Sequence, residues 1–401
     1  MANPYKEIFA APGSVAFSAS GFIARLPLGM VTLGIVTMLS QTHGTYWLAG
    51  AVSATFALSN ALIAPQVSRL MDRFGQSRVL PISSLITIAA LAGLMLAAHY
   101  RTPDWTLFLF AMLAGFMPSM TALVRARWTE IYRDTPKLRT AFAFESVVDE
   151  VIYMVGPIIA IGFSVALFPQ AGPLAATLLL AVGSALFVAQ KSTEPAIHPQ
   201  DRTDNASVIR LPSLQIIAVT LAAIGALFGT AEVTAIAFAE GQGQKAAAGI
   251  ALASYAAGSL IVGLVFGALK LQMPLAKQFL LAIGLAMLTT LPLLIVEGTG
   301  GLSIALFLAG AAVSPTIIIS MGLIERIVPA AKLTEGITWA MTGVMIGMAL
   351  GSSLSGWVID EYGASRGFYV SVGAGVLAFV AAFAFCLRYG PKPQVQLKTA
   401  V

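Results

Sequence analysis

The sequence predicts an all-α integral membrane protein with twelve transmembrane helices, arranged as two six-helix bundles related by a parallel pseudo-twofold repeat. Three observations support this fold class. The 401-residue chain is 58% hydrophobic and only 10% charged, and its apolar residues fall into about twelve runs of 19 to 29 residues. Each run is long enough to cross a hydrocarbon core of ~30 Å as a helix. The other two observations are an uneven distribution of positive charges and an internal repeat.

The expected spans follow one another with mostly short connections. In chain order they cover residues 14–39, 46–68, 79–99, 105–125, 140–168, 171–190, 213–239, 246–269, 278–296, 301–323, 335–358 and 367–388. The longest connection, 191–212, is polar, contains prolines and lies at the middle of the chain. We therefore expect an N-terminal six-helix bundle over 1–190, a cytoplasmic linker over 191–212, and a C-terminal six-helix bundle with a short tail over 213–401.

Positive charges concentrate in alternate connections between the spans. Nineteen of the 23 Lys and Arg residues lie in one set, three (Arg101, Lys245 and Arg366) lie in the opposite set, and Arg25 lies inside a span. The positive-inside rule places the basic set in the cytoplasm. We therefore expect a multi-pass protein of the cell (inner) membrane with both termini cytoplasmic. Orientation and anionic lipid headgroups explain these cations, so we expect no nucleic-acid partner.

Several kinds of chemistry lack the residues they need. The single cysteine, Cys386, excludes an intramolecular disulfide and a thiolate metal cluster. His43, His99 and His198 are too scattered for a zinc site. The sequence contains no GxxxxGK[ST] loop, which argues against direct coupling to ATP. We expect no enzyme, no catalytic residues, no metal and no cofactor.

The two halves of the chain resemble each other. A shift of 195 residues places 130–156 over 325–351 without a gap, so that Glu130 meets Glu325 and Gly156 meets Gly351. Parallel repeats about an axis along the membrane normal are typical of two-bundle transporters, whose substrate site lies between the repeats. The repeat therefore predicts a site between the two bundles.

The loop after the second span reads SRLMDRFGQSR and resembles the signature loop of the major facilitator superfamily. Asp72, Arg73 and Gly75 match that motif. Ser68 replaces its leading glycine, and the usual basic pair is absent, although Arg78 stands just beyond it. Together with twelve spans and two related halves, this resemblance covers nearly the whole chain.

The resemblance implies a role for this loop in a cytoplasmic gate. In the family the loop latches the two bundles together, so Asp72 and Arg73 are expected to form part of the latch. Gly75 allows a tight turn with positive φ, and an acid at a helix end can pair with loop arginines or with the N-terminus of another helix. The alternative is a topological anchor without a conformational role.

The fifth span contains Gly156-Pro157, which is similar to the Gly-Pro motif of the family's drug/proton antiporters. Proline removes one backbone hydrogen bond and can kink a helix. The antiporter arginine of the fourth span would fall at Ala111, so it is missing. The resemblance implies a bacterial efflux permease, with antiport less directly supported than membership of the superfamily.

Charged residues inside the spans are the candidates for proton coupling or substrate binding. If the fifth helix begins near Thr140, Asp149 and Glu150 lie about 14 Å inside it, and Glu145 lies one turn nearer the cytoplasm. Arg25 lies at a similar depth in the first span. Because a charge at the bilayer centre is costly, such residues face a cavity or a partner.

Two interpretations of these charges remain open. Asp149 or Glu150 binds a proton and Arg25 tunes its proton affinity, or Arg25 and an acid form a permanent structural pair. One cation cannot neutralise two neighbouring acids, which favours at least one protonatable group. Glu232, in the outer part of the seventh span, is either a residue of the periplasmic vestibule or a ligand for substrate or proton.

The sequence therefore predicts a secondary transporter that exports a small organic solute in exchange for protons by alternating access. Its expected partners are that solute, protons and membrane lipids, and it is expected to be a monomer. Within the spans acids outnumber bases, which favours a neutral or cationic solute. The alternatives are an uptake symporter or uniporter with the same fold, and a non-transporting membrane receptor or lipid-handling protein.

Overall fold

A computed structural model of the chain describes residues 4–44, 46–197, 206–244, 247–269 and 271–389. Within these ranges the regular structure is helical, and eleven helices are long and apolar enough to cross a membrane. The predicted all-α fold class is confirmed. Residues 198–205 of the expected linker and 390–401 of the expected tail lie outside the described residues.

The N-terminal bundle contains a short first helix and the six predicted spans, one of which consists of two helices. Its helices are α1 (Pro4–Ile8), α2 (Ser14–His43), α3 (Tyr46–Phe74), α4 (Gln76–Tyr100), α5 (Asp104–Ala114), α6 (Met120–Tyr132), α7 (Pro136–Ala166) and α8 (Ala171–Ala189). The helix α7 starts at Pro136 rather than near Thr140, because proline is well suited to the first turn of a helix. This earlier start places Asp149 about 20 Å along the helix instead of the expected 14 Å.

The C-terminal bundle repeats this plan. Its helices are α9 (Pro212–Gly241), α10 (Ala247–Ala268), α11 (Leu275–Thr290), α12 (Thr299–Ala311), α13 (Val313–Ile327), α14 (Leu333–Tyr362) and α15 (Phe368–Tyr389), with short 3₁₀ segments at Lys191–Thr193, Val208–Arg210, Leu291–Ile295, Ala330–Lys332 and Ala364–Gly367. The predicted tenth span is divided between α12 and α13 around Ala312.

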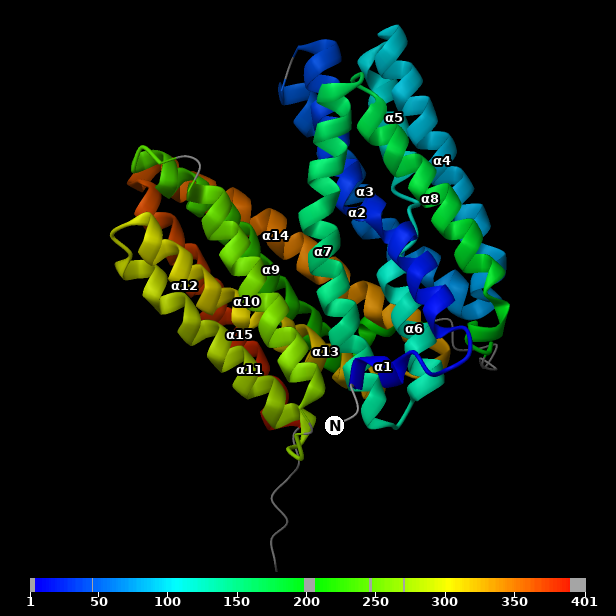
Figure 1. Cartoon of the computed structure of the whole chain (residues 1–401), viewed down its shortest axis with the longest axis vertical. Coiled ribbons are helices and arrows are strands. Elements are labelled where there is room, and N and C mark those ends of the chain that lie inside the picture. Colours follow the sequence, from blue (N-terminus) through cyan, green and yellow to red (C-terminus); the bar gives the residue numbers. More distant parts are fainter. Residues whose placement is uncertain (1–3, 45, 198–205, 245–246, 270, 390–401) are drawn as a thin grey trace, which may run out of the picture.

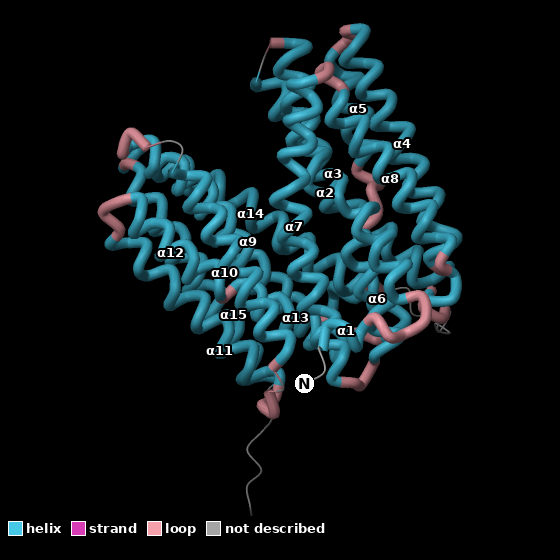
Figure 2. The backbone as a smooth tube through the Cα atoms, viewed as in Figure 1, coloured by secondary structure: helices cyan, strands magenta, loops and turns pink. Residues whose placement is uncertain are grey.

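The bundles meet at one end and diverge at the other (Figures 1 and 2). We call the end that holds α1, the last turns of α3 and α10, and the first turns of α7 and α14 the latched end. The opposite end is the open end. Buried apolar side chains form one cluster that joins the C-terminal bundle to the latched part of the N-terminal bundle. A second cluster belongs to the N-terminal bundle alone and extends towards the open end. The shared core therefore holds the bundles together at the latched end.

Candidate functional site

The fourth predicted span is interrupted inside the N-terminal bundle, which differs from the continuous helix expected over 105–125. Residues 115–119 (Gly-Phe-Met-Pro-Ser) are not helical. Pro118 lacks a backbone N–H and disfavours a helical conformation for the residue before it. The side-chain amide of Asn60 on α3 donates to the carbonyl oxygens of Gly115 at 3.0 Å and Met117 at 2.9 Å. Asn60 thus satisfies two backbone carbonyl groups that have no helical partner at the break.

This break changes the location of two arginines. The helix α6 begins only at Met120 and continues to Tyr132, so Arg125 and Arg127 lie within it and are fully buried. We expected both among the cations of a cytoplasmic connection, and that assignment was wrong. The charge asymmetry between the two sets of connections remains, but the protein interior gains two cations.

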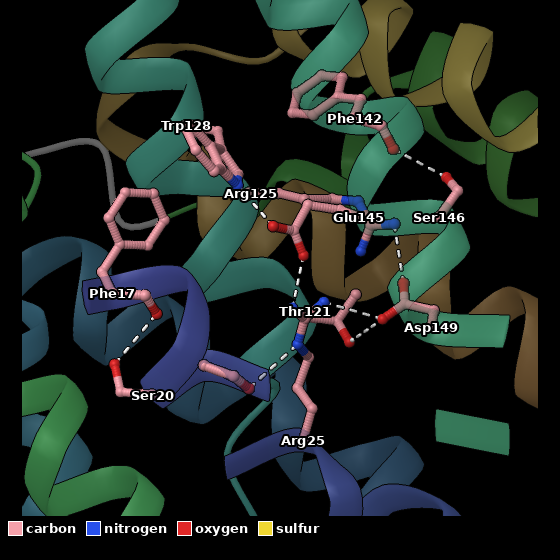
Figure 3. Close-up of polar contacts among 11 residues, drawn as sticks. Phe17, Ser20, Arg25, Thr121, Arg125, Trp128, Phe142, Glu145, Ser146 and Asp149 are labelled. Carbon is pink, nitrogen blue, oxygen red and sulfur yellow. Dashed lines mark hydrogen bonds and ion pairs between the residues drawn. The ribbon is translucent and has the colours of Figure 1, made fainter. Parts of the chain in front are cut away.

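Two arginines and two carboxylates form a charged network inside the N-terminal bundle (Figure 3). Arg25 on α2 lies 2.5 Å from Glu145 through Nη2 and 3.0 Å from Asp149 through Nη1. Arg125 Nη2 lies 2.8 Å from the other oxygen of Asp149. The side chains of Arg25, Glu145 and Arg125 are at most 1% exposed, and Asp149 is 18% exposed. Because buried charges require close partners, this network ties α2 and α6 to α7.

Neutral donors complete the network. The indole Nε1 of Trp128 donates to Glu145 at 2.6 Å, and the hydroxyl of Thr121 approaches Asp149 at 3.5 Å. Arg25 Nε donates to the carbonyl oxygen of Gly21 at 3.2 Å. The geometry therefore pairs Arg25 with Glu145 and Asp149, and it adds a second arginine, so the charges of these four residues balance.

Glu150 points away from this network and towards the other bundle. Neighbouring residues on a helix project about 100° apart, so Asp149 and Glu150 face different partners. The hydroxyl of Ser259 on α10 donates to Glu150 at 2.7 Å, and Ser259 lies 2.8 Å from Ser314 on α13. No ion pair joins Glu150 to a lysine or arginine among the residues that the structure describes. This carboxyl group therefore links the two bundles without a cationic partner.

A cavity of about 1160 Å³, which includes its opening to solvent, lies between the bundles. Arg25, Arg125, Asp149, Glu150 and Tyr153 contribute polar groups to its wall. Much of the remaining wall is apolar and comes from both bundles; it includes Leu28, Met117, Met120, Ile224, Phe228, Ile317, Met341, Val344, Met345 and Met348. An apolar cavity with a few convergent polar groups is typical of a small-molecule site.

The acid of the signature loop contacts the opposite bundle. The Asp72 carboxylate, at the end of α3, accepts hydrogen bonds from the backbone N–H groups of Thr334 at 3.2 Å and Glu335 at 2.8 Å. N–H groups at the start of a helix have no acceptor within that helix, and the helix dipole there favours a negative charge. The hydroxyls of Ser68 and Thr338 lie 2.8 Å apart in the same contact. We expected Asp72 to pair either with loop arginines or with the N-terminus of another helix, and the structure shows the contact with a helix N-terminus.

The pseudo-equivalent contact occurs on the other side of the latched end. The hydroxyl of Thr140, in the first turns of α7, donates to the carbonyl oxygen of Gly267 at the end of α10 at 2.9 Å. The 195-residue shift carries Asp72 onto Gly267 and Thr140 onto Glu335. Two equivalent pairs of helix ends are therefore joined, α3 to α14 through a charged group and α10 to α7 through a neutral one.

The remaining loop residues lie around this contact. Gly75 adopts φ of 91°, a conformation that side-chain-bearing residues rarely adopt. Arg73 and Arg78 are exposed, and the Arg73 guanidinium lies 5.3 Å from the ring centroid of Phe74. Arg133 forms a further contact between bundles, 3.7 Å from Glu325.

The Gly156-Pro157 motif of α7 and Glu232 of α9 lie away from the charged network. Gly156 packs directly against the backbone of Gly29 on α2, where an added Cβ would approach to 2.9 Å, and α7 remains helical through Pro157. Glu232 is exposed on α9 and is not among the residues that line the cavity. Close helix packing thus accounts for the glycine.

The fold and the cavity between the bundles define the class of this protein as a multi-pass membrane transporter. A family model described as Major Facilitator Superfamily matches residues 17–306 and 217–400, so the chain belongs to the major facilitator superfamily. As a member of this superfamily it is a transporter of small molecules rather than an enzyme. No curated protein sequence matches the chain.

Solved transporter structures share the fold at low sequence identity. A bacterial homologue of the iron transporter ferroportin, in an outward-facing state, has a TM-score of 0.72 and 14% identity over 94% of this chain and 100% of that one. The human organic anion transporter MFSD10 (TETRAN) has a TM-score of 0.70 and 15% identity, covering 93% and 100% of the two chains. The transporter FucP in its outward conformation has a TM-score of 0.70 and 13% identity, covering 93% and 98%.

Several residues of the site were not identified from the sequence. Arg125, Asn60 and Ser259 all make contacts that define it. The signal for Arg125 was Pro118, because a proline in the middle of an apolar run can end one helix and shift the start of the next. Asn60 and Ser259 are single polar residues in apolar helices, and only their partners distinguish them from ordinary packing residues.

Proposed function

We propose that this protein is a proton-coupled secondary transporter that exports a small organic solute by alternating access, and that Glu150 carries the coupled proton. One observation carries the proposal: Glu150 lines the cavity and reaches Ser259 of the opposite bundle with no ion-pair partner among the described residues. The other acids of α7, Glu145 and Asp149, both pair with arginines.

The difference in partners gives the acids different roles. Asp149 pairs with both Arg25 and Arg125, so this acid is suited to a structural ion pair. Among the described residues Glu150 has one hydroxyl partner, Ser259, and no cationic one, so its proton can be gained or lost without breaking an ion pair. Since its hydrogen bond crosses between the bundles, its charge changes the interface that must rearrange during alternating access.

The distribution of loop cations supports an orientation. The connections rich in Lys and Arg, such as those holding Arg69, Arg73 and Arg78, lie at the latched end. We propose that the latched end is cytoplasmic, that the cavity opens to the periplasm of the cell (inner) membrane, and that both termini are cytoplasmic. In this arrangement 1–190 and 213–401 are the two moving units, and 191–212 connects them. Membrane lipids contact the apolar outer faces of the monomer.

Proton co-transport in the same direction as the solute is a second candidate. The cavity contains both Glu150 and Arg125, and two nitrogens of Arg125 have no hydrogen-bond partner among the described residues. A solute that binds Arg125 through an acidic group would be repelled by an ionised Glu150, so solute and proton would bind together. Exchange instead requires that their binding be mutually exclusive.

Flux through purified protein in proteoliposomes tests the proposal. A solute panel is loaded inside or outside, a pH gradient of either sign is imposed, and solute and proton movements are recorded together. Export coupled to protons predicts solute movement opposite to the proton gradient, whereas co-transport predicts movement along it. Solute flux that is independent of the pH gradient would contradict proton coupling. Binding of a panel member without flux would indicate a receptor.

A further inference from the structure

We propose that Arg125 forms the binding subsite for the acidic group of an organic anion in the cavity between the bundles. This inference rests on the proposed function only in assuming that the cavity is the path of the solute. It names a substrate class that the sequence did not favour, because Arg125 was assigned to a loop.

Two arginines of α6 provide the evidence. Every side-chain nitrogen of Arg127 has a partner: Nε donates to Gln76, Nη1 to the Gln190 carbonyl and Thr193, and Nη2 to the Phe187 carbonyl, at distances of 2.8 to 3.2 Å. Arg125 lies two residues earlier and is equally buried, yet only its Nη2 has a partner. Its Nε and Nη1 are buried without a hydrogen bond to any described residue.

Unpartnered donors of this kind are uncommon in a protein interior. Burying a polar group costs free energy when no hydrogen bond replaces its water, and the cost is larger for a charged group. Arg127 faces the interior of its own bundle, whereas Arg125 lines the cavity. The unused donors therefore belong to a residue of the cavity wall, just beneath its surface, and the charge-balanced network holds the guanidinium in place.

A guanidinium suits a carboxylate or a similar acidic group. Such pairs form short, charge-assisted hydrogen bonds whose planar geometry adds specificity. The opposite wall of the cavity carries Phe228, Met341 and Met345, which offer an apolar surface from the other bundle. The combination selects an organic acid with an apolar body, since the acid binds one bundle and the body packs on the other.

Glu150 lies in the same cavity and opposes this ligand when ionised. The anion and a proton on Glu150 therefore favour each other's binding, and a confirmed anion subsite would support co-transport over exchange. The groups around Glu150 are Asp149 and Tyr153 on its own helix, Ser259 and Tyr255 on α10, Ser314 on α13, and Arg125 on α6, which is bonded to Asp149.

Binding by matched acids and amides tests the subsite without requiring flux. The probes are benzoate and benzamide, phenylacetate and phenylacetamide, and octanoate and octanamide, each titrated against purified full-length protein at constant ionic strength. Thermal unfolding reports binding, because a ligand of the native state raises Tm. We expect at least one acid to raise Tm while its amide, of the same shape, binds about tenfold more weakly or worse.

Three variants distinguish acid binding at Arg125 from a general attraction of anions to a positively charged protein. Asp149→Asn frees Nη2 as a further donor, so acid binding is retained or strengthened. Arg125→Gln combined with Asp149→Asn removes both charges, keeps the balance of the network and is expected to abolish the preference for acids. Arg366→Gln removes an exposed cation at the open end, outside the cavity, and serves as the control.

The outcomes are distinct from those for coupling. Acid preference in the wild type that disappears in the double variant and persists in Asp149→Asn and Arg366→Gln supports the proposal. Equal binding of acids and amides, the absence of binding by every acid, or acid preference that survives the double variant would overturn it. Failure of proton coupling in the flux assay would leave a positive binding result intact, and proton-coupled flux of a neutral solute would survive a negative one.

Discussion

The two bundles share a fold but carry different chemistry. Under the 195-residue shift, Glu145, Asp149 and Glu150 of α7 correspond to Ala340, Val344 and Met345 of α14. Val344 and Met345 line the same cavity as Asp149 and Glu150, but they contribute only apolar surface. The N-terminal bundle thus supplies the charges of the site, and the C-terminal bundle supplies a wall on which a solute can pack.

The features that the halves share are features of the helical framework. The fourth span of each half is interrupted, between α5 and α6 at 115–119 and between α12 and α13 around Ala312. Each half also joins the end of its second span to the start of the fifth span of the other half. Asp72 makes this contact between α3 and α14, and Gly267 makes it between α10 and α7. The broken fourth span and the contact between helix ends are present twice, whereas the ion-paired groups of the cavity are present once.

Breaking the charged network should have the largest effect on stability. Arg25→Gln leaves Glu145 and Asp149 with one arginine between them, and we expect a loss of about 3–5 kcal/mol in the free energy of unfolding. Arg25→Gln combined with Glu145→Gln should recover much of that loss, because Asp149 keeps Arg125. Denaturant unfolding in detergent measures both variants. A single variant as stable as the wild type would show that the pair contributes little.

The charged half of the latch should matter next. Asp72→Asn removes the charge from the N-terminus of α14 and should weaken the contact by about 1.5–3 kcal/mol, the range for hydrogen bonds to charged groups. We expect slower flux and a larger distance between spin labels at Arg78→Cys and Lys277→Cys, with Cys386 replaced by serine. Unchanged flux and distances would reduce the loop to a topological anchor.

The neutral half of the latch should respond less. Thr140→Val keeps the shape of the side chain and removes the hydrogen bond to Gly267, for which we expect about 0.5–1.5 kcal/mol. The same spin-label pair should therefore show a smaller shift than in Asp72→Asn. If Thr140→Val opened the latched end more than Asp72→Asn, the charge at α14 would not dominate the latch.

Glu232, the candidate acid of the C-terminal bundle, should have the smallest effect. Glu232→Gln alters an exposed side chain outside the cavity, so stability should change by no more than about 0.5 kcal/mol. Its pH-driven flux should match that of the wild type in proteoliposomes. A loss of coupling in this variant would transfer the proton site to the second half of the molecule.

The sequence was sufficient for the fold class, because apolar run lengths constrain membrane helices strongly. Arg25 and the three acids of α7 were also identifiable, since each interrupts an apolar run at a depth where charge is costly. Periodicity could not show which acid met Arg25. That outcome depends on helix rotation, on the start of α7 at Pro136, and on helices distant in sequence.

Arg125 shows that the pattern of apolar runs does not reveal which cations tertiary contacts bury inside the protein. It stands at the end of an apolar run, two residues before Arg127, so the sequence alone suggests a loop cation. It becomes an interior residue only because Pro118 interrupts the fourth span and Asn60 satisfies the freed carbonyl groups. Similarly, Glu150 differs from Asp149 through Ser259, which lies 109 residues away in the chain.

The most direct test of the central claim compares two kinds of flux in Glu150→Gln. Substrate counterflow exchanges solute across the membrane without net proton movement, whereas pH-driven flux requires the coupled proton. We predict that Glu150→Gln retains counterflow and loses pH-driven flux, because a glutamine can keep the hydrogen bond to Ser259 but cannot gain or lose a proton. Unchanged pH-driven flux in Glu150→Gln would contradict the assignment of Glu150 as the proton carrier.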